Sequence, residues 1–314
     1  MRLAARCCGY WSYQDTADHL AEFCGIHLSH TTLGSLAGQT SEELSAKIAD
    51  SPVFRETFQK AKGSPEFYVD GTCVHTRNED GKPEWREMRC GAFAKREQGA
   101  SATPEEYETR EVPKPTVVSA FAAIETKEVF QERCQHERRR VGVGGVSSAL
   151  GDGAAWIWNI VRDVFGKTEE CLDFYHALEH VSDCGKVLYG NGETFTSWLD
   201  KMRLVLLSEG FAGMERELLS VLSGKWKKGQ REAVGALQKY LHKNESRLHY
   251  AERLARGQPI GSGLIEGACK NLVGRRLKQT GACWRVEQAN RMAVICSLLY
   301  SKQWKNEWKI PKKL

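Results

Sequence analysis

The chain has 314 residues, of which 41% are hydrophobic, so it can bury one large core or two to three smaller ones. No apolar run approaches the roughly 20 residues that cross a bilayer, and the N-terminal stretch lacks the apolar segment of a secretory signal. The 11 cysteines are odd in number and include no C-x-x-C pair, which disfavours both a disulfide framework and a zinc knuckle. We therefore expect a cytoplasmic protein with reduced thiols and no membrane partner.

The formal net charge of +5 is unevenly distributed along the chain. After Glu266 there are 11 Lys and Arg residues and two acidic residues, so this segment carries +9 and residues 1–266 carry −4. A basic block on a slightly acidic body favours a polyanionic partner such as DNA at that end. A solubilising tail is the alternative interpretation.

Residues 1–63 are predicted to be helical. Residues 10–24 show the apolar spacing of a helix, Gly25 is expected to end it, and Ser29 is expected to cap a second, short helix. Residues 41–65 follow as a further amphipathic helix with a Gly/Ser/Pro stop. The helix-turn-helix outline is typical of DNA-binding segments, but simple packing of a helical hairpin gives the same pattern.

Residues 64–176 are predicted to contain most of the strands. One surrounds Asp70, "PEWREMRCGAFAK" and "TVVSAFAAIET" supply two more, and a short buried strand ends near Asp152 before a helix. A last strand in "EECLDFYHALEH" runs into another helix. Residues 177–258 are almost entirely helical, and residues 259–314 hold the Glu266 helix and basic C-terminal helices. This order predicts an α/β (α+β) mixed sheet with an N-terminal helical segment and a large all-α insertion.

Three acidic residues occupy positions suited to metal chemistry. Asp70 and Asp152 are each expected at the end of a strand, where they would lie side by side if the two strands are neighbours. Asp-Gly is also a common turn pair, so either residue alone could be structural. Glu266 opens a late helix after a Gly-Ser-Gly approach. A surface ion pair with Lys270 is the alternative for Glu266, although it does not explain the positive charge that follows. Contacts to DNA phosphates explain that charge, and we expect them at Lys270, Arg275, Arg276 and Lys278.

Three carboxylates that no Lys or Arg neutralises can hold two Mg²⁺ ions about 4 Å apart, with Mn²⁺ as a substitute. Such a pair activates an oxygen nucleophile and stabilises a leaving oxygen, which is what cleavage of a phosphodiester requires. Because like charges repel, we expect the metal-free site to be partly disordered or electrostatically strained.

Four segments carry a resemblance to a known family: "FYVDGTCVHTR", "GDGAAWIWNIV", "LDFYHALEHV" and "GSGLIEGACKNLVGRRLKQTGACWRVEQANRM". Together they resemble bacterial insertion-sequence transposases of the DDE class over roughly residues 10–300. The resemblance implies an RNase H-like core, with Asp70, Asp152 and Glu266 as the catalytic triad and an all-α insertion before the Glu helix. Members of that family are usually longer at the N-terminus, so we expect part of the region that recognises DNA ends to be missing.

The segment "DFYH" adds a D-x-x-H pair, Asp173 and His176, similar to one in Mutator-like and hAT-like transposases. It would organise DNA near the cleaved end, although a His at a helix start can also be structural. Trp284 and Arg285 could form a stacking platform and a phosphate or base contact. A buried Trp beside a surface Arg is an equal alternative.

The resulting expectation is a Mg²⁺-dependent DNA transposase that cleaves and joins strands at element ends and target DNA, as a homodimer on DNA. One alternative is a non-catalytic DNA-binding remnant of a transposase. Another is a different RNase H-like DNA nuclease, which the D-x-x-H pair and the long insertion disfavour.

Overall fold

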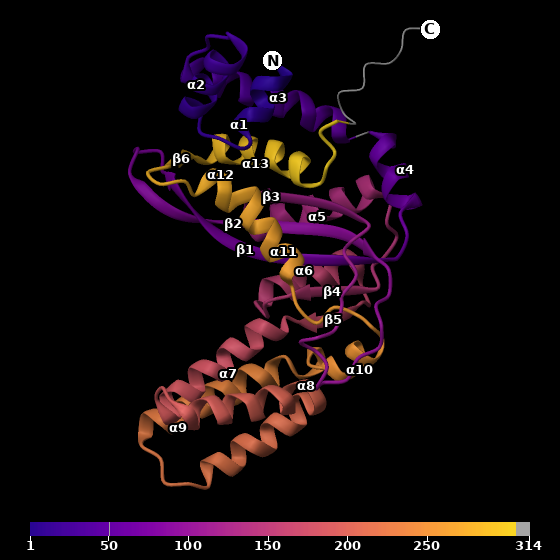
Figure 1. Ribbon diagram of the computed structural model, residues 1–314, viewed down its shortest axis with the longest axis vertical. Helices are drawn as coiled ribbons and strands as arrows, with labels where there is room; N and C mark the ends of the chain where they lie inside the picture. Colours follow the sequence, from indigo (N-terminus) through magenta and orange to yellow (C-terminus); the bar gives the residue numbers. More distant parts are fainter. Residues whose placement is uncertain (50, 306–314) are drawn as a thin grey trace.

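The computed structural model describes residues 1–49 and 51–305 and shows an elongated molecule with one sheet near its middle (Figure 1). The N-terminal helices lie at one end, and an arm of helices extends from the other. The sheet is mixed, with strand order β3-β2-β1-β4-β5, and a short β6 pairs with the far end of β1. The strands are β1 (Ser64–Arg77), β2 (Pro83–Arg96), β3 (Val117–Ala123), β4 (Ser148–Gly151), β5 (Glu169–Leu172) and β6 (Trp284–Arg285).

The five strands predicted between residues 64 and 176 are confirmed. They form an antiparallel half and a parallel half of one sheet, which meet at β1. β1, β2 and β3 form an antiparallel meander, whereas β4 and β5 run parallel to β1 on its other side. The crossovers are helical: α5 (Lys127–Val141) connects β3 to β4, and α6 (Ala155–Phe165) connects β4 to β5. The chain is therefore a mixed α/β protein with helices outnumbering strands.

One detail of β1 corrects the sequence-based prediction. Asp70 is not at the end of a strand, because Asp70 pairs with Cys90, Gly71 pairs with Arg89, and the ladder continues to Arg77. The left-handed backbone that makes Asp-Gly a turn is absent at Gly71 and appears instead at Gly81, with φ 77°, in the β1–β2 hairpin. Pairing along all of β2 keeps Gly71 extended.

The N-terminal region is helical as predicted, but its helices differ in number and length. Ser12 caps α2, Gly25 ends it with φ 64°, and the Ser29 hydroxyl accepts a hydrogen bond from the Thr32 N–H at 3.1 Å. The second helix then runs for 20 residues and is not short, and the amphipathic helix expected within residues 41–65 is present but begins at Pro52, after the second helix has ended, and stops before Gly63. The helices are α1 (Arg2–Cys8), α2 (Tyr13–Cys24), α3 (His30–Ala49) and α4 (Pro52–Lys60).

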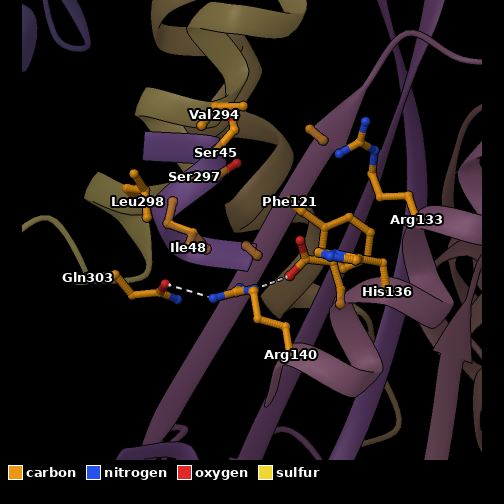
Figure 2. A pocket seen from close by; sticks show the side chains of 13 residues that line it. Ser45, Ile48, Phe121, Arg133, His136, Arg140, Val294, Ser297, Leu298 and Gln303 are labelled. Carbon is orange, nitrogen blue, oxygen red and sulfur yellow. Dashed lines mark hydrogen bonds and ion pairs between the residues drawn. The ribbon is translucent and has the colours of Figure 1, made fainter. Parts of the chain in front are cut away.

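The helix α13 (Val286–Tyr300) packs between the N-terminal helices and the sheet, and a small cavity lies beside it. About 160 Å³ is enclosed between α3, β3, α5 and α13, and Figure 2 shows Arg140 pointing across it toward Gln303. Arg140 is 5% exposed and also donates hydrogen bonds to Glu137 and Ser119. All three nitrogens of the buried guanidinium therefore have a hydrogen-bond acceptor. Since these acceptors lie on different segments, the network connects α5, β3 and the C-terminal segment.

The helical arm follows β5 and confirms the all-α character predicted for residues 177–258, although the expected boundary at residue 177 falls inside α7. Its longest helix is kinked at Gly210, where φ is 56° and the Leu248 carbonyl lies too close for a side chain. No helix in the described part of the chain has the length and apolarity to cross a membrane. The arm contains α7 (Phe174–Tyr189), α8 (Glu193–Leu222), α9 (Lys228–Lys243), η1 (Glu245–Arg247) and α10 (Tyr250–Ala255).

The chain then returns to the sheet, and the predicted Glu266 helix lies across β1 and β2. It is continuous but not uniform: α11 (Gly263–Ala268) passes into a π-helical turn, η2 (Cys269–Gly274), and then into α12 (Arg275–Leu277). Turns of this kind are rare and are often found at functional sites. The last residues of the basic block, 306–314, lie outside the described residues.

Candidate active site

Two aspartates meet where β1 passes the end of β4. Tyr68 pairs with Leu150 in the parallel β1–β4 ladder, and the same register carried two residues further aligns Asp70 with Asp152. Asp152 comes directly after β4, at the carboxyl ends of the parallel strands, where ligands of open α/β sheets bind. The topology therefore brings together two of the three carboxylates singled out in the sequence.

Each aspartate is oriented by hydrogen bonds. Oδ1 of Asp70 accepts the N–H of Gly71 at 2.7 Å, and Oδ2 accepts the thiol of Cys269 at 3.5 Å. Oδ1 of Asp152 accepts the N–H of Ala154 at 2.9 Å. Cys269 reaches Asp70 because it begins the π-helical turn of the helix that crosses β1.

Glu266 and Asp173 are linked through one serine. Asp173 follows β5 and caps α7 by accepting the N–H of His176 at 2.7 Å. Its other oxygen accepts the N–H of Ser262, whose hydroxyl donates to Oε1 of Glu266 at 3.2 Å. The D-x-x-H aspartate and the Glu helix are thus held in a fixed relation at the strand ends, with Asp173 buried.

These carboxylates repel one another. Burial raises the pKa of Asp70, and the charges of Asp152 and Asp173 add to the rise, while the Gly71 N–H opposes it. Burial also raises the pKa of Glu266, with further contributions from Asp173 and Asp70. Burial and the neighbouring carboxylates therefore raise the pKa of both groups.

In the described part of the chain, no Lys or Arg is paired with these carboxylates. Within residues 1–49 and 51–305, none of Asp70, Asp152, Asp173 and Glu266 forms an ion pair with a Lys or Arg. The Glu266–Lys270 pair, which was the alternative interpretation, does not form. Lys270 lies in the π-helical turn that follows α11, and Glu266 accepts a hydrogen bond from the Ser262 hydroxyl instead.

The donor set fits a hard divalent cation. Carboxylate oxygens are the ligands that Mg²⁺ prefers, and four clustered carboxylates without a cationic partner form a negatively charged site. Within the described residues, no three His, Cys, Asp or Glu side chains already have the spacing of a metal site. Asp70, Asp152 and Glu266 are the side chains that would hold the ions, with Asp173 next to them.

Two aromatic side chains beside the carboxylates were not predicted from the sequence. The ring of His180 lies 3.9 Å from that of Tyr240, and the Tyr240 hydroxyl donates to the Asp152 carbonyl at 3.4 Å. His176 contacts His180 edge to face at 5.0 Å. Burial, followed by His176, lowers the pKa of His180. The i,i+4 spacing of the two histidines was a usable signal, but nothing in the sequence pointed to Tyr240.

The basic residues predicted to contact DNA divide into two groups. Lys270, Arg275, Lys278 and Arg285 are exposed, and Lys278 donates to the hydroxyl of Thr72 on β1, two residues from Asp70. These four side chains lie at or close to the Glu helix, and they remain candidates for phosphate contacts.

Arg276 and Trp284 are buried, which disagrees with the DNA contact predicted for Arg276 and the stacking platform predicted for Trp284. Arg276 is 3% exposed, lies between the rings of Tyr13 and Trp284 at 4.9 and 4.8 Å, and donates to the Cys8 carbonyl. Trp284 is 8% exposed, and its indole N–H donates to the Leu277 carbonyl. Both side chains are therefore buried, Arg276 against Cys8 of α1 and Tyr13 of α2, and Trp284 in β6 beside Arg276. The alternative of a buried Trp beside an exposed Arg285 describes the structure.

A scan against models of known protein families gives no match, and a search of the curated proteins finds no significant relative.

Proposed function

We propose that this chain is a metal-dependent DNA transposase of the DDE class, built on an RNase H-like core, that cleaves and joins DNA strands at the ends of an insertion sequence. The observation that carries the proposal is the alignment of Asp70 with Asp152 across the β1–β4 ladder, with Glu266 linked to the same cluster. An antiparallel β1–β3 meander joined to parallel β4 and β5 also agrees with such a core.

The protein's own contribution is positioning. The Gly71 N–H and the Cys269 thiol orient the two oxygens of Asp70, and the Ala154 N–H orients one oxygen of Asp152, so both carboxylates are positioned before any ion binds. Ser262 fixes Glu266 relative to Asp173. When bound, two Mg²⁺ ions would activate the attacking oxygen and stabilise the leaving oxygen of a phosphodiester.

DNA is the partner that the surrounding charge supports. A cluster of carboxylates alone repels a phosphate, so cations must hold the strand on either side of it. Lys270, Arg275 and Lys278 are exposed on the helix that carries Glu266, and Arg285 is exposed just beyond it. Pairing of two element ends would require a second copy of the chain, so a homodimer on DNA belongs to the same proposal.

The test is cleavage of a labelled DNA that carries candidate element ends, in Mg²⁺ or Mn²⁺, by the wild type and by Glu266→Gln. We expect cleavage by the wild type only. Glu193→Gln, at the exposed start of α8, is the matched control and should cleave normally. DNA binding without cleavage by the wild type would contradict catalysis and favour the non-catalytic remnant. Cleavage without strand joining would favour another RNase H-like nuclease.

A further inference from the structure

The helical arm carries a concentration of positive charge separate from the basic C-terminal block. Between residues 223 and 243 there are six basic residues and one acidic residue, a net charge of +5. All six basic side chains are exposed. They are Lys225, Lys227, Lys228, Arg231, Lys239 and Lys243, and we refer to them as the α9 basic stripe.

The charge of the α9 basic stripe is largely uncompensated, unlike that of the neighbouring helix. In α8, Lys201 pairs with Glu217 at 2.6 Å and Arg216 with Glu209 at 2.7 Å. In the stripe, the one ion pair among the described residues joins Lys228 to the single acidic residue, Glu232, at 3.9 Å. A solvated helix surface with no binding role usually mixes both signs, as α8 does.

The stripe residues within α9 lie on one side of the helix, whereas Lys225 and Lys227 lie in the loop before it. Lys228, Arg231 and Lys239 are spaced i, i+3 and i+11, which places them opposite the buried Val234 and Leu237. At about 1.5 Å per residue, the 16 residues of α9 extend roughly 24 Å. Near the C-terminal end of α9, the Tyr240 hydroxyl reaches the carbonyl of Asp152, so this end of the helix lies next to the candidate active site and the α8–α9 loop lies at the other end.

The outer end of the stripe is held in a defined position. The indole N–H of Trp226 donates to the Val221 carbonyl at 2.6 Å, and its ring contacts Tyr189 at 5.6 Å. Gln230 donates to the Leu188 carbonyl at 2.9 Å. These contacts fasten the α8–α9 loop to the end of α7, so its lysines are displayed on a structured tip.

We propose that the α9 basic stripe binds the phosphate backbone of the DNA that extends from the cleaved phosphodiester. This inference rests on the proposed function. A row of cations on a helix that ends next to a carboxylate cluster fits a polymer whose phosphates repeat regularly. Its length of roughly 24 Å matches about seven base pairs at 3.4 Å each. Backbone contacts of this kind position DNA without reading its sequence.

The experiment measures binding of a labelled 40-base-pair duplex of random sequence to the full chain at several salt concentrations between about 50 and 200 mM. The variant combines Lys227→Gln, Lys228→Gln and Arg231→Gln. We expect the slope of log K against log salt to fall by about 2 to 3, since each phosphate contact contributes about 0.9. The matched control combines Lys60→Gln, Lys62→Gln and Lys127→Gln, exposed residues of the sheet-proximal helices α4 and α5 and the segment after α4, with the same loss of charge.

The outcomes separate this inference from the proposed function. An unchanged slope in the α9 variant, with wild-type binding intact, overturns the inference alone. An equal fall in the control variant also overturns it, because the effect would then come from net charge and not from the stripe. Absence of any DNA binding by the wild type would remove the proposed function as well. Unchanged melting temperatures of both variants would exclude misfolding as the cause.

Discussion

Acidic side chains lie at both ends of the parallel strands, but among the described residues they are paired with cations at one end only. Where β5 begins, Glu169 contacts Arg253 at 2.9 Å, Arg256 at 2.7 Å and His249 at 3.0 Å, and Glu170 contacts Arg247 at 2.6 Å. Where β4 and β5 end, the carboxylates lie together without a Lys or Arg partner in the described residues. The same sheet therefore has a neutralised end and an unneutralised one.

The pKa shifts report the same contrast. Burial opposes ionisation of Glu169, but Arg253 and Arg256 overcome it and lower its pKa. At the other end, burial and neighbouring carboxylates act in the same direction and raise the pKa of Asp70 and of Glu266. Unpaired, mutually repelling carboxylates lower stability and are typical of functional sites. We therefore interpret the Glu169 end as a structural ion network and the Asp70 end as a candidate binding site.

The largest expected effect is at the unneutralised end. Asp70→Asn should reduce DNA cleavage by about 10³-fold or more, because it removes a carboxylate that would hold the metal ions. Binding of the random-sequence duplex should change little, since Asp70 contributes no positive charge. Cleavage assays and fluorescence anisotropy on the same preparation measure both. Equal loss of cleavage and binding would contradict the catalytic assignment of Asp70.

Substitutions at the neutralised end should change the stability of the fold. Arg253 is fully buried and also donates to the Pro259 carbonyl, so Arg253→Ala should destabilise the fold by about 3 kcal/mol or more. Arg256→Ala is the control: its side chain is 47% exposed and should cost about 1 kcal/mol or less. Urea denaturation distinguishes them, and similar losses for both would show that burial does not set the strength of this network.

Arg275 and Arg276 are adjacent on the Glu helix, but one is exposed and the other is buried, so their substitution should have different effects. Arg275→Ala should lower the salt slope of DNA binding by about one and leave stability unchanged, because Arg275 is exposed. Arg276→Ala should lower stability by about 2 kcal/mol and leave the slope unchanged, because Arg276 is enclosed by Tyr13 and Trp284. Thermal melting and salt titration check each variant. The reverse pattern would mean that the two side chains exchange their environments in solution.

The smallest expected effect concerns the metal-free protein. A carboxyl whose pKa is raised by folding contributes stability below its unfolded pKa, about 3.9 for Asp, and that contribution is lost as pH rises through the folded pKa. In EDTA, Asp70→Asn should therefore melt about 2 to 4 °C above the wild type at pH 7, with the gap closing toward pH 4. Calorimetry measures the gap. A gap that widened on acidification would contradict the repulsion.

Sequence periodicity and turn chemistry were enough to predict most local structure. The strands around Asp70 and before Asp152, the cap at Ser29 and the stop at Gly25 depend on nearby residues, so they could be predicted without the fold. Asp152 could also be selected from the strand that precedes it, whereas Asp70 was selected as the end of a strand that in fact continues to Arg77. That Gly71 is extended could not be predicted, because pairing with β2 overrides the turn preference of Asp-Gly.

Only the tertiary structure decided which side chains meet. Asp70 and Asp152 are 82 positions apart in sequence, and the parallel β1–β4 register alone aligns them. Burial of Arg276 depends on how α1 and α2 pack, and the approach of Tyr240 to Asp152 depends on how the helical arm returns to the sheet. Sequence determines local conformation through short-range sterics and hydrogen bonding, whereas contacts between distant segments depend on packing that no local pattern encodes.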